Sequence, residues 1–284
     1  MPIRHYLSAC LCFKNAANYL AEWLAFYTVL GVDHFFLYNN ESADSYARVV
    51  APYIAAGTAT LIDFSGKGIQ HALYSHCLST YGHRTRWLMF CDDDEFLFPV
   101  GDVGLPDVLH RYEKFAGVAV SWMLYGSSGH WAPPRGLVIQ NYAMRSAAPD
   151  HHVKCIVDPS RTVRPIVVGH HFECVPGEVV VDENGEAMSG PLHPRPSTNI
   201  LRINHYLTKS RTEMFERRRR IQVNTGQVSP LSLDQWVELE ATWNQTRDPI
   251  AARYGDRVRE TAAGAQHGGG SSIFEFACEA PRLR

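Results

Sequence analysis

Four acidic residues in succession, Asp92, Asp93, Asp94 and Glu95, lie between the apolar residues 87–90 and 96–98. Carboxylates this close together repel one another, which raises their pKa values unless a divalent cation or hydrogen-bond donors compensate the charge. In an extended segment, the side chains of Asp92 and Asp94 share one face. One of them can then contact a ribose or a water while the other ligates a metal ion that holds a diphosphate. For an Asp-x-Asp pair taken alone, a solvated acidic turn is the alternative.

Alternating strands and helices in the first hundred residues must position this cluster. The apolar pattern predicts strands at 6–13, 34–38, 60–64 and 87–90, with helices at 18–30, 46–50 and 69–81 between them. Asn18 is expected to cap the first helix, and Pro52 to break the second. Right-handed crossovers place the carboxyl ends of parallel strands along one rim. That rim would carry residues 13–15, 39–42, 65–68 and the acids, which suits a nucleotide diphosphate.

Composition and charge exclude several classes of protein. A chain of 284 residues, 45% of them apolar, can bury one large core. A net charge of −2 argues against a general nucleic-acid binder. Residues 65–68 lack P-loop spacing, and no Gly-x-Gly-x-x-Gly follows the first strand, which disfavours a nicotinamide or flavin dehydrogenase. Seven cysteines without framework spacing, and no cleavable signal or membrane span, predict a soluble cytoplasmic protein.

The order of several motifs resembles one group of enzymes, the bacterial family 2 and family 92-like glycosyltransferases. The matching segments are residues 12–15, 19–24, 31–35, 38–44 and 87–99, and then 122–130, 152–159 and 204–210. The resemblance covers about residues 5 to 220. It implies an α/β fold of the GT-A type, with a mostly parallel central sheet flanked by helices, a nucleotide-sugar donor (a UDP- or GDP-sugar) and a divalent metal at the Asp-x-Asp pair.

The resemblance also suggests roles for individual residues. The expected metal ligands are Asp92, Asp94 and His205, and an imidazole beside carboxylates favours manganese over magnesium. The expected donor contacts are Lys14, Asn15, Asn39, Asp92, Asp93, Lys154 and Lys209, with the two later lysines neutralising the leaving diphosphate. Aromatic rings and hydroxyls that suit a sugar follow a strand at residues 117–124. They give the expected acceptor contacts Trp122, Tyr125, Gly126, Ser127, Ser128 and His130.

Transfer with inversion, which the resemblance implies, needs a base that deprotonates the acceptor hydroxyl. The sequence does not identify that base. Glu173 is our candidate, with Asp150 and Asp158 as competitors. Each of these carboxylates can equally be a surface group.

The remaining residues predict helices and a tail. Capping boxes at Ser210 and Ser232 predict helices after them, and a further helix is expected at residues 249–260. We therefore expect a catalytic domain at 1–220 (donor half 1–100, acceptor half 101–220), a helical extension at 221–263 and a flexible glycine-rich tail at 264–284. The arginines at 217–220 are expected to be either a solvated surface or a contact with an anionic membrane.

The hypothesis from the sequence is a metal-dependent glycosyltransferase that acts on a carbohydrate hydroxyl in polysaccharide biosynthesis. Two alternatives stay open at this stage. A nucleotidyltransferase has a similar acidic site but releases pyrophosphate. A non-catalytic sugar- or nucleotide-binding protein needs no catalytic metal.

Overall fold

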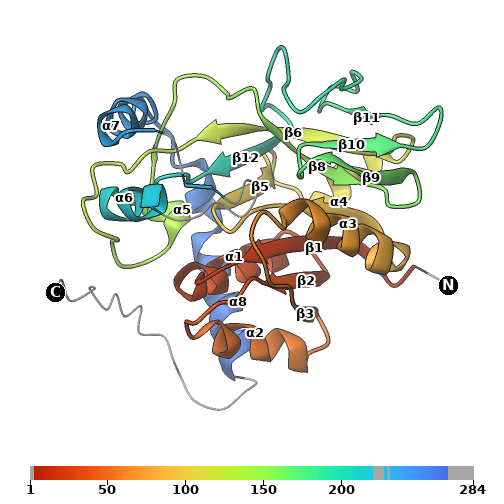
Figure 1. Ribbon diagram of the computed structural model, residues 1–284, viewed down its shortest axis with the longest axis horizontal. Helices are drawn as coiled ribbons and strands as arrows, with labels where there is room; N and C mark the ends of the chain where they lie inside the picture. The colour runs from red at the N-terminus through yellow and green to blue at the C-terminus, as the bar shows by residue number, and fades with distance from the viewer. Residues whose placement is uncertain (1–2, 220–226, 229–230, 268–284) are drawn as a thin grey trace.

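A nine-stranded mixed sheet forms the centre of the molecule in the computed structural model, which describes residues 3–219, 227–228 and 231–267 (Figure 1). The strand order is β3-β2-β1-β4-β8-β6-β12-β5, and β11 pairs with β6. These strands are β1 (His5–Phe13), β2 (His34–Asn39), β3 (Ala59–Asp63), β4 (Thr85–Phe90), β5 (Glu95–Pro99), β6 (Gly117–Leu124), β8 (Val153–Val157), β11 (Val180–Val181) and β12 (Leu201–His205). The predicted α/β class is confirmed.

The first four strands of the sheet are parallel, as the sequence predicts. Strand β1 pairs with β2 and β4, and β2 pairs with β3, all in parallel. The connecting helices are α1 (Ala17–Val29), α2 (Tyr46–Ala55) and α3 (Gln70–Tyr81), the last followed by a 3-10 turn, η1 (Gly82–Arg84). Alternate residues of β1 face opposite layers. Leu7 and Leu11 pack in the core beneath α1, whereas Cys10 and Cys12 pack with α3.

Two local predictions in this half are wrong. Asn18 does not cap α1, because the helix begins at Ala17 and its first N–H donates to Asp44 Oδ2 in the next rim loop (2.8 Å). Helix α2 does not break at Pro52 but continues to Ala55. The proline removes a single helical hydrogen bond near the end of an exposed helix, so the break is not enforced.

The second half of the sheet is mixed. Strand β8 runs antiparallel to both β4 and β6, β12 runs parallel to β6, and β5 closes the edge antiparallel to β12. This register places His205, the last residue of β12, opposite Glu95 of β5 and Leu124 of β6. The end of β12 is thereby brought to the acid cluster.

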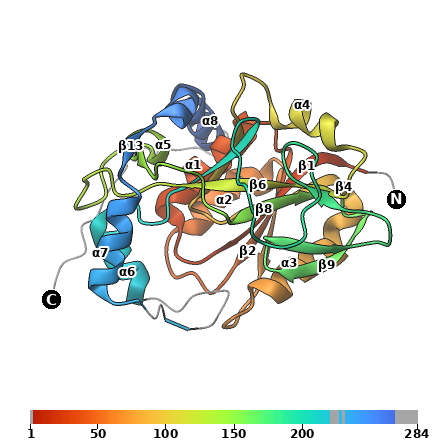
Figure 2. The ribbon, with the colours of Figure 1, turned by 90° about the horizontal axis from the view of Figure 1, so that it is seen from above.

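Several short helices and strand pairs lie outside the central sheet. They are the helices α4 (Leu105–Leu109), η2 (His110–Tyr112) and α5 (Val138–Asn141), the hairpin of β9 (Thr162–Val167) and β10 (His171–Cys174), and the pair of β7 (Met144–Arg145) with β13 (Thr246–Arg247). The hairpin packs on the α3 side of the sheet (Figure 2).

The C-terminal helices pack on the body of the protein. They are α6 (Arg211–Arg219), α7 (Leu233–Thr242), η3 (Ile250–Tyr254) and α8 (Gly255–His267). The capping boxes at Ser210 and Ser232 are both present. In Figure 1, α6 and α7 stand at the edge toward which β6 and β12 point, and α8 lies along α1. Helix α8 continues to His267, into the segment predicted as a tail. The rest of that tail lies outside the described residues.

No helix within the described part of the chain combines the length and apolar character that crossing a membrane requires. The run of arginines is only partly described, because Arg220 lies outside the described residues.

Gly126 is a position where the fold requires glycine. It follows β6, and a Cβ atom there would overlap the side chain of Asn244, which follows α7. We expect Gly126→Ala to lower the free energy of unfolding by about 1–3 kcal/mol, the usual cost of overpacking a tight contact. Gly101→Ala is the control, since a Cβ atom there meets nothing within 4 Å. Urea denaturation of both variants checks this, and equal stabilities would contradict it.

Candidate functional site

The rim loops after β1 and β2 are joined by hydrogen bonds. Asn15 has a left-handed backbone (φ 53°), its N–H donates to Ser42 Oγ (2.9 Å), and its side-chain oxygen accepts from Ala43 N (2.8 Å). Asn39 donates to Asp63 Oδ1 (2.8 Å) and accepts from Ser42 N (2.9 Å). The side chains of Asn15 and Asn39 therefore hold the rim loops together. Lys14 lies at the same rim, half exposed, 3.3 Å from Glu41.

The acid cluster is a turn between β4 and β5 rather than an extended segment. Within the turn, Glu95 N donates to Asp92 O (3.1 Å). Two side chains of helix α1 also hold the backbone of the turn: Trp23 Nε1 donates to Asp92 O (3.0 Å), and Tyr27 Oη donates to Glu95 O (3.0 Å). As a result Asp92 and Asp94 have different partners. The prediction that their side chains share one face is wrong, because the chain reverses between them.

Asp92 is bonded to neighbouring elements of the protein. Its Oδ1 accepts from Gln70 (2.8 Å) and Tyr74 (3.3 Å) of α3, and its Oδ2 from Lys154 Nζ of β8 (2.8 Å). Burial alone would raise the pKa of Asp92, but Lys154 holds it below its ordinary value. Both oxygens are engaged, so the structure does not support Asp92 as a metal ligand.

Lys154 is a buried structural cation. Its side chain is 1% exposed, and Nζ also lies 3.5 Å from Glu95 Oε2. Burial would lower the pKa of Lys154, but Asp92 and Glu95 raise it above its ordinary value. Burial raises the pKa of Glu95 to about 7, although Lys154 opposes that rise. A lysine held in this way has no access to a ligand, so its predicted contact with the diphosphate is not supported.

Asp94 and His205, both with buried side chains, form the second half of the site. Asp94 Oδ1 lies 3.4 Å from His205 Nε2, and Asp94 Oδ2 pairs with Arg217 of α6. Burial would raise the pKa of Asp94, but Arg217 and His205 hold it well below its usual range. Asp94 therefore stays ionised at any physiological pH.

The Asp94–His205 pair fits two ligands of a divalent cation. Asp94 Oδ1 and both ring nitrogens of His205 are buried and make no hydrogen bond. Oxygen and nitrogen atoms bound to one ion at about 2.1 Å lie roughly 3.0–3.5 Å apart, as these two atoms do. Among the described residues, no group of three or more His, Cys, Asp or Glu side chains is arranged to hold a metal. The predicted set of three ligands is thus reduced to two, with the other positions left to ligand and water oxygens.

Lys209 and Asp93 lie close to this pair. Lys209 has a left-handed backbone (φ 50°), and its Nζ lies 4.0 Å from the ring centre of Tyr19. Burial raises the pKa of Asp93, with the charge of Lys209 opposing the rise. Both residues are partly exposed. Lys209 therefore remains a cation within reach of a ligand.

The loop predicted to bind an acceptor instead anchors the C-terminal segment. Tyr125 is buried and its hydroxyl bonds Arg202 (2.6 Å) and Asp248 O (3.0 Å). Ser127 is buried and bonds Glu240 of α7, and Ser128 N donates to Asn244 (2.8 Å). The backbone of Gly126 bonds the same region.

These contacts do not support acceptor roles for Tyr125, Gly126, Ser127 or Ser128. Their polar groups are already paired inside the protein. His130 is half-buried, and its Nε2 lies 3.2 Å from Asn141 O. Trp122 is different. It is half-buried beside His205, with 4.4 Å between ring centres, and its Nε1 is buried without a hydrogen bond.

The three candidate bases lie in different settings. Glu173, on β10, pairs with Arg164 of the same exposed hairpin (2.6 Å). Asp158 is buried and pairs with Arg86 and Arg161, so it is structural. Asp150 accepts from His152 Nδ1 (2.7 Å). Among the three, only Asp150 is linked through its neighbours to the Asp94–His205 pair, since the ring of Trp122 lies against both His152 and His205.

Sequence reasoning missed two residues of the site, Arg217 and His152. Arg217 was grouped with a surface run, but it faces Asp94 because the capping box at Ser210 fixes the start of α6. The one sequence signal for His152 was its spacing from Asp150, which is typical of many loops.

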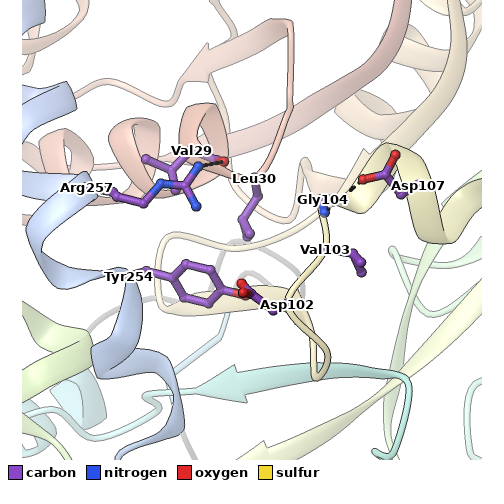
Figure 3. A pocket seen from close by; sticks show the side chains of 8 residues that line it. All are labelled: Val29, Leu30, Asp102, Val103, Gly104, Asp107, Tyr254 and Arg257. Carbon is purple, nitrogen blue, oxygen red and sulfur yellow. Dashed lines mark hydrogen bonds between the residues drawn. The ribbon is translucent and has the colours of Figure 1, made fainter.

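A hollow in the surface lies away from these groups. It is lined by residues at the end of α1, in the loop before α4, in α4, in η3 and in α8, among them Asp102, Tyr254 and Arg257 (Figure 3). Arg257 donates to Val29 O (3.1 Å) at its edge. None of the predicted site residues lines it.

Comparison with known proteins identifies the family. Residues 5–184 match the model of glycosyltransferase family 92, which is more than half of the chain. The chain belongs to glycosyltransferase family 92. The matched residues include β1 to β10 and the acid turn but not His205. The family 92 part of the predicted resemblance is confirmed.

Curated family 92 proteins from plants share part of this chain. One from Oryza sativa subsp. japonica is 30% identical over 178 residues, covering 61% of this chain and 30% of that protein. One from Ricinus communis is 29% identical over 187 residues, covering 61% of this chain and 32% of that protein. The chain therefore spans about a third of the length of these family 92 relatives.

Solved structures resemble the family 92 fold more distantly. S. aureus TarS 1–349 in complex with UDP-GlcNAc has a TM-score of 0.42 and 10% identity, covering 93% of this chain and 73% of that one. Glucosyl-3-phosphoglycerate synthase from Mycobacterium tuberculosis, in complex with Mn2+, UDP and glucosyl-3-phosphoglycerate, has a TM-score of 0.29 and 16% identity, covering 40% and 43%. Both scores lie below 0.5, so nothing about ligands follows from them.

Replacing Lys154 with methionine tests the buried half of the site. Asp92 and Glu95 would be left without their cation, so we expect Lys154→Met to lower the free energy of unfolding by about 3–5 kcal/mol. Lys67→Met, at an exposed loop position, should change it by no more than about 0.5 kcal/mol. Urea denaturation at neutral pH measures both. A loss below 1 kcal/mol for Lys154→Met would contradict the structural role of this lysine.

Tyr125→Phe tests whether Tyr125 is part of the scaffold. The variant loses the hydroxyl that bonds Arg202 and Asp248, so we expect a loss of about 1–3 kcal/mol in the free energy of unfolding. The KM for an acceptor should not change. Unchanged stability with a raised acceptor KM would favour the original acceptor prediction.

Proposed function

We propose that this protein is a GT-A-type, metal-dependent, inverting glycosyltransferase that moves a sugar from a nucleoside diphosphate to a carbohydrate hydroxyl. The observation that carries the proposal is the Asp94–His205 pair. Two buried ligand atoms without hydrogen bonds converge there, at the rim where open α/β sheets bind ligands. Membership of family 92 supports the transfer of a glycosyl group.

Asp94 and His205 would hold the metal ion. The ion stabilises the negative charge that develops on the leaving diphosphate. A carboxylate oxygen with an imidazole nitrogen is a ligand set that suits manganese better than magnesium. Asp92, held by Lys154, would support the turn that carries Asp94.

The remaining cations at the rim would bind the diphosphate. Arg217 is about half exposed and pairs with Asp94, so a metal ion at Asp94 would free its guanidinium for phosphate oxygens. Lys209 and Lys14 lie at the same rim and add positive charge. The partly exposed carboxylate of Asp93 and the backbone of the Asn15 and Asn39 loops would contact the nucleoside. We expect a UDP- or GDP-sugar as donor.

The acceptor is proposed to be a carbohydrate in polysaccharide biosynthesis. Trp122 is the predicted acceptor contact that the structure best supports, because its ring lies beside His205 and its Nε1 has no hydrogen bond. An indole face stacks against the C–H face of a sugar. A peripheral membrane contact would use the arginines other than Arg217.

Replacing Asp94 with asparagine tests the metal site. The variant keeps the shape of the side chain but loses its charge, so we expect turnover to fall by roughly 10²–10³. Thermal stabilisation of the protein by a nucleoside diphosphate with manganese should also be lost. Asp102→Asn, in the remote surface hollow, should leave both unchanged.

The same assays decide between classes of enzyme. Thermal shift with a panel of nucleoside diphosphates and nucleotide sugars, with and without manganese, reports binding. Release of a nucleoside diphosphate supports glycosyl transfer, whereas release of pyrophosphate would identify a nucleotidyltransferase. Full turnover in Asp94→Asn would overturn the metal assignment.

A further inference from the structure

A histidine and an aspartate outside the metal pair are arranged as a catalytic dyad. Asp150 Oδ1 accepts from both His152 N (2.8 Å) and His152 Nδ1 (2.7 Å). The backbone holds this arrangement against β6, because Asp150 N donates to Trp122 O (2.8 Å) and Trp122 N to His152 O (3.1 Å). The position of the His152 imidazole is thus fixed by the backbone hydrogen bonds of His152 and by the hydrogen bond of one ring nitrogen.

The aspartate sets which nitrogen of His152 carries the proton. A carboxylate accepts, so Nδ1 is the protonated nitrogen and Nε2 presents its lone pair. The side chain of His152 is 50% exposed and that of Asp150 28%, so half of the His152 side chain is accessible from solvent. An aspartate that orients a histidine in this way also stabilises the imidazolium once it has taken a proton.

Trp122 connects the dyad to the metal pair. The rings of Trp122 and His152 are stacked, with 5.0 Å between centres and 22° between planes, and the Trp122 ring lies 4.4 Å from that of His205. The Trp122 ring therefore contacts both histidine rings, which places the Asp150–His152 dyad next to the Asp94–His205 pair.

The other groups around His152 do not compete for the proton. His170 lies 6.0 Å away, ring centre to ring centre, and its Nδ1 bonds Val153 O (2.6 Å). Burial, followed by the charge of Lys154, lowers the pKa of His170 to about 4, so it is neutral. The ammonium group of Lys154 is already paired with the carboxylates of Asp92 and Glu95.

We propose that His152 is the general base of the transfer and Asp150 its positioning residue. This rests on the proposed function and deepens it. The proton of the acceptor hydroxyl moves to His152 Nε2 as the acceptor oxygen forms its bond to the anomeric carbon. The bond from that carbon to the diphosphate oxygen breaks, and its electron pair leaves with the diphosphate. His152 then gives the proton to solvent.

The geometry favours this dyad over a free carboxylate. Glu173 is bonded to Arg164 on an exposed hairpin, and Asp158 is enclosed by two arginines. Asp150 uses one oxygen to hold His152. The base is then the imidazole that Asp150 orients.

The test compares two histidines that are paired with a carboxylate. His152→Ala should lower transfer by about 10²–10⁴, the usual contribution of a general base. The matched control is His110→Ala, because His110 Nδ1 lies 2.8 Å from Glu113 on the surface and its side chain is 61% exposed. Transfer is measured as release of nucleoside diphosphate from the nucleotide sugar that stabilises the wild-type protein, with a panel of methyl hexosides as acceptors.

Four further readouts separate a base from a structural residue. The thermal shift of His152→Ala with nucleotide and manganese should match that of the wild type, because the donor site is intact. Added imidazole should restore part of the lost rate in His152→Ala and none in Asp94→Asn. Asp150→Asn, which no longer fixes the tautomer, should lose less than His152→Ala in rate and keep donor binding. His152→Gln, which keeps a polar side chain of similar length, should be as slow as His152→Ala.

Each outcome decides the proposal. Transfer by His152→Ala within threefold of the wild type, or a lost rate that imidazole leaves unchanged in a folded protein, would overturn His152 as base while leaving the glycosyltransferase standing. A wild-type protein that neither binds nucleotide sugars nor releases nucleoside diphosphate would overturn the proposed function, and with it the base.

Discussion

Compensation of the carboxylate charge in the turn between β4 and β5 is the constraint on which the rest of the structure depends. All four acids have shifted pKa values. Burial raises those of Asp93 and Glu95, whereas neighbouring cations overcome the effect of burial at Asp92 and Asp94 and lower theirs. Lys154 reaches it from β8, and Arg217 reaches it from α6. Buried charges of one sign are stable only when cations or donors are fixed beside them. The register of β8 and the position of α6 are therefore tied to the turn.

The backbone of the turn is fixed by aromatic side chains of α1. Trp23 and Tyr27 are fully buried, and both donate hydrogen bonds to carbonyl groups of the turn. Tyr27 also accepts from Leu97 N (2.8 Å). These bonds satisfy buried peptide groups that a tight turn leaves without partners. The helix that covers the sheet thus sets the direction in which each carboxylate points.

The local pattern of the sequence was sufficient for the strands and helices of the first half, but not for the partners of their side chains. The period of apolar residues reports which face is buried, so β1 to β4 and the rim were predictable. The division between Asp92 and Asp94 depends on a chain reversal and on Lys154, which is distant in sequence. Tyr125 and Ser127 resemble a sugar-binding loop in composition, yet their partners Arg202 and Glu240 come from elements that no local pattern connects to them.

The two halves of the acid turn differ in how easily the paired side-chain cation can be displaced from its carboxylate. This difference explains how one motif can both stabilise the fold and provide a candidate binding site. Lys154 is enclosed, so its release would expose two buried carboxylates at a cost of several kcal/mol. Arg217 is about half exposed at the end of a flexible side chain, so solvent can replace its contact with Asp94 at little cost. In the proposed function, a divalent cation would compete for Asp94 with Arg217, the weaker of the two partners. The enclosed pair with Lys154 would keep the turn in place while the exposed pair with Arg217 exchanges.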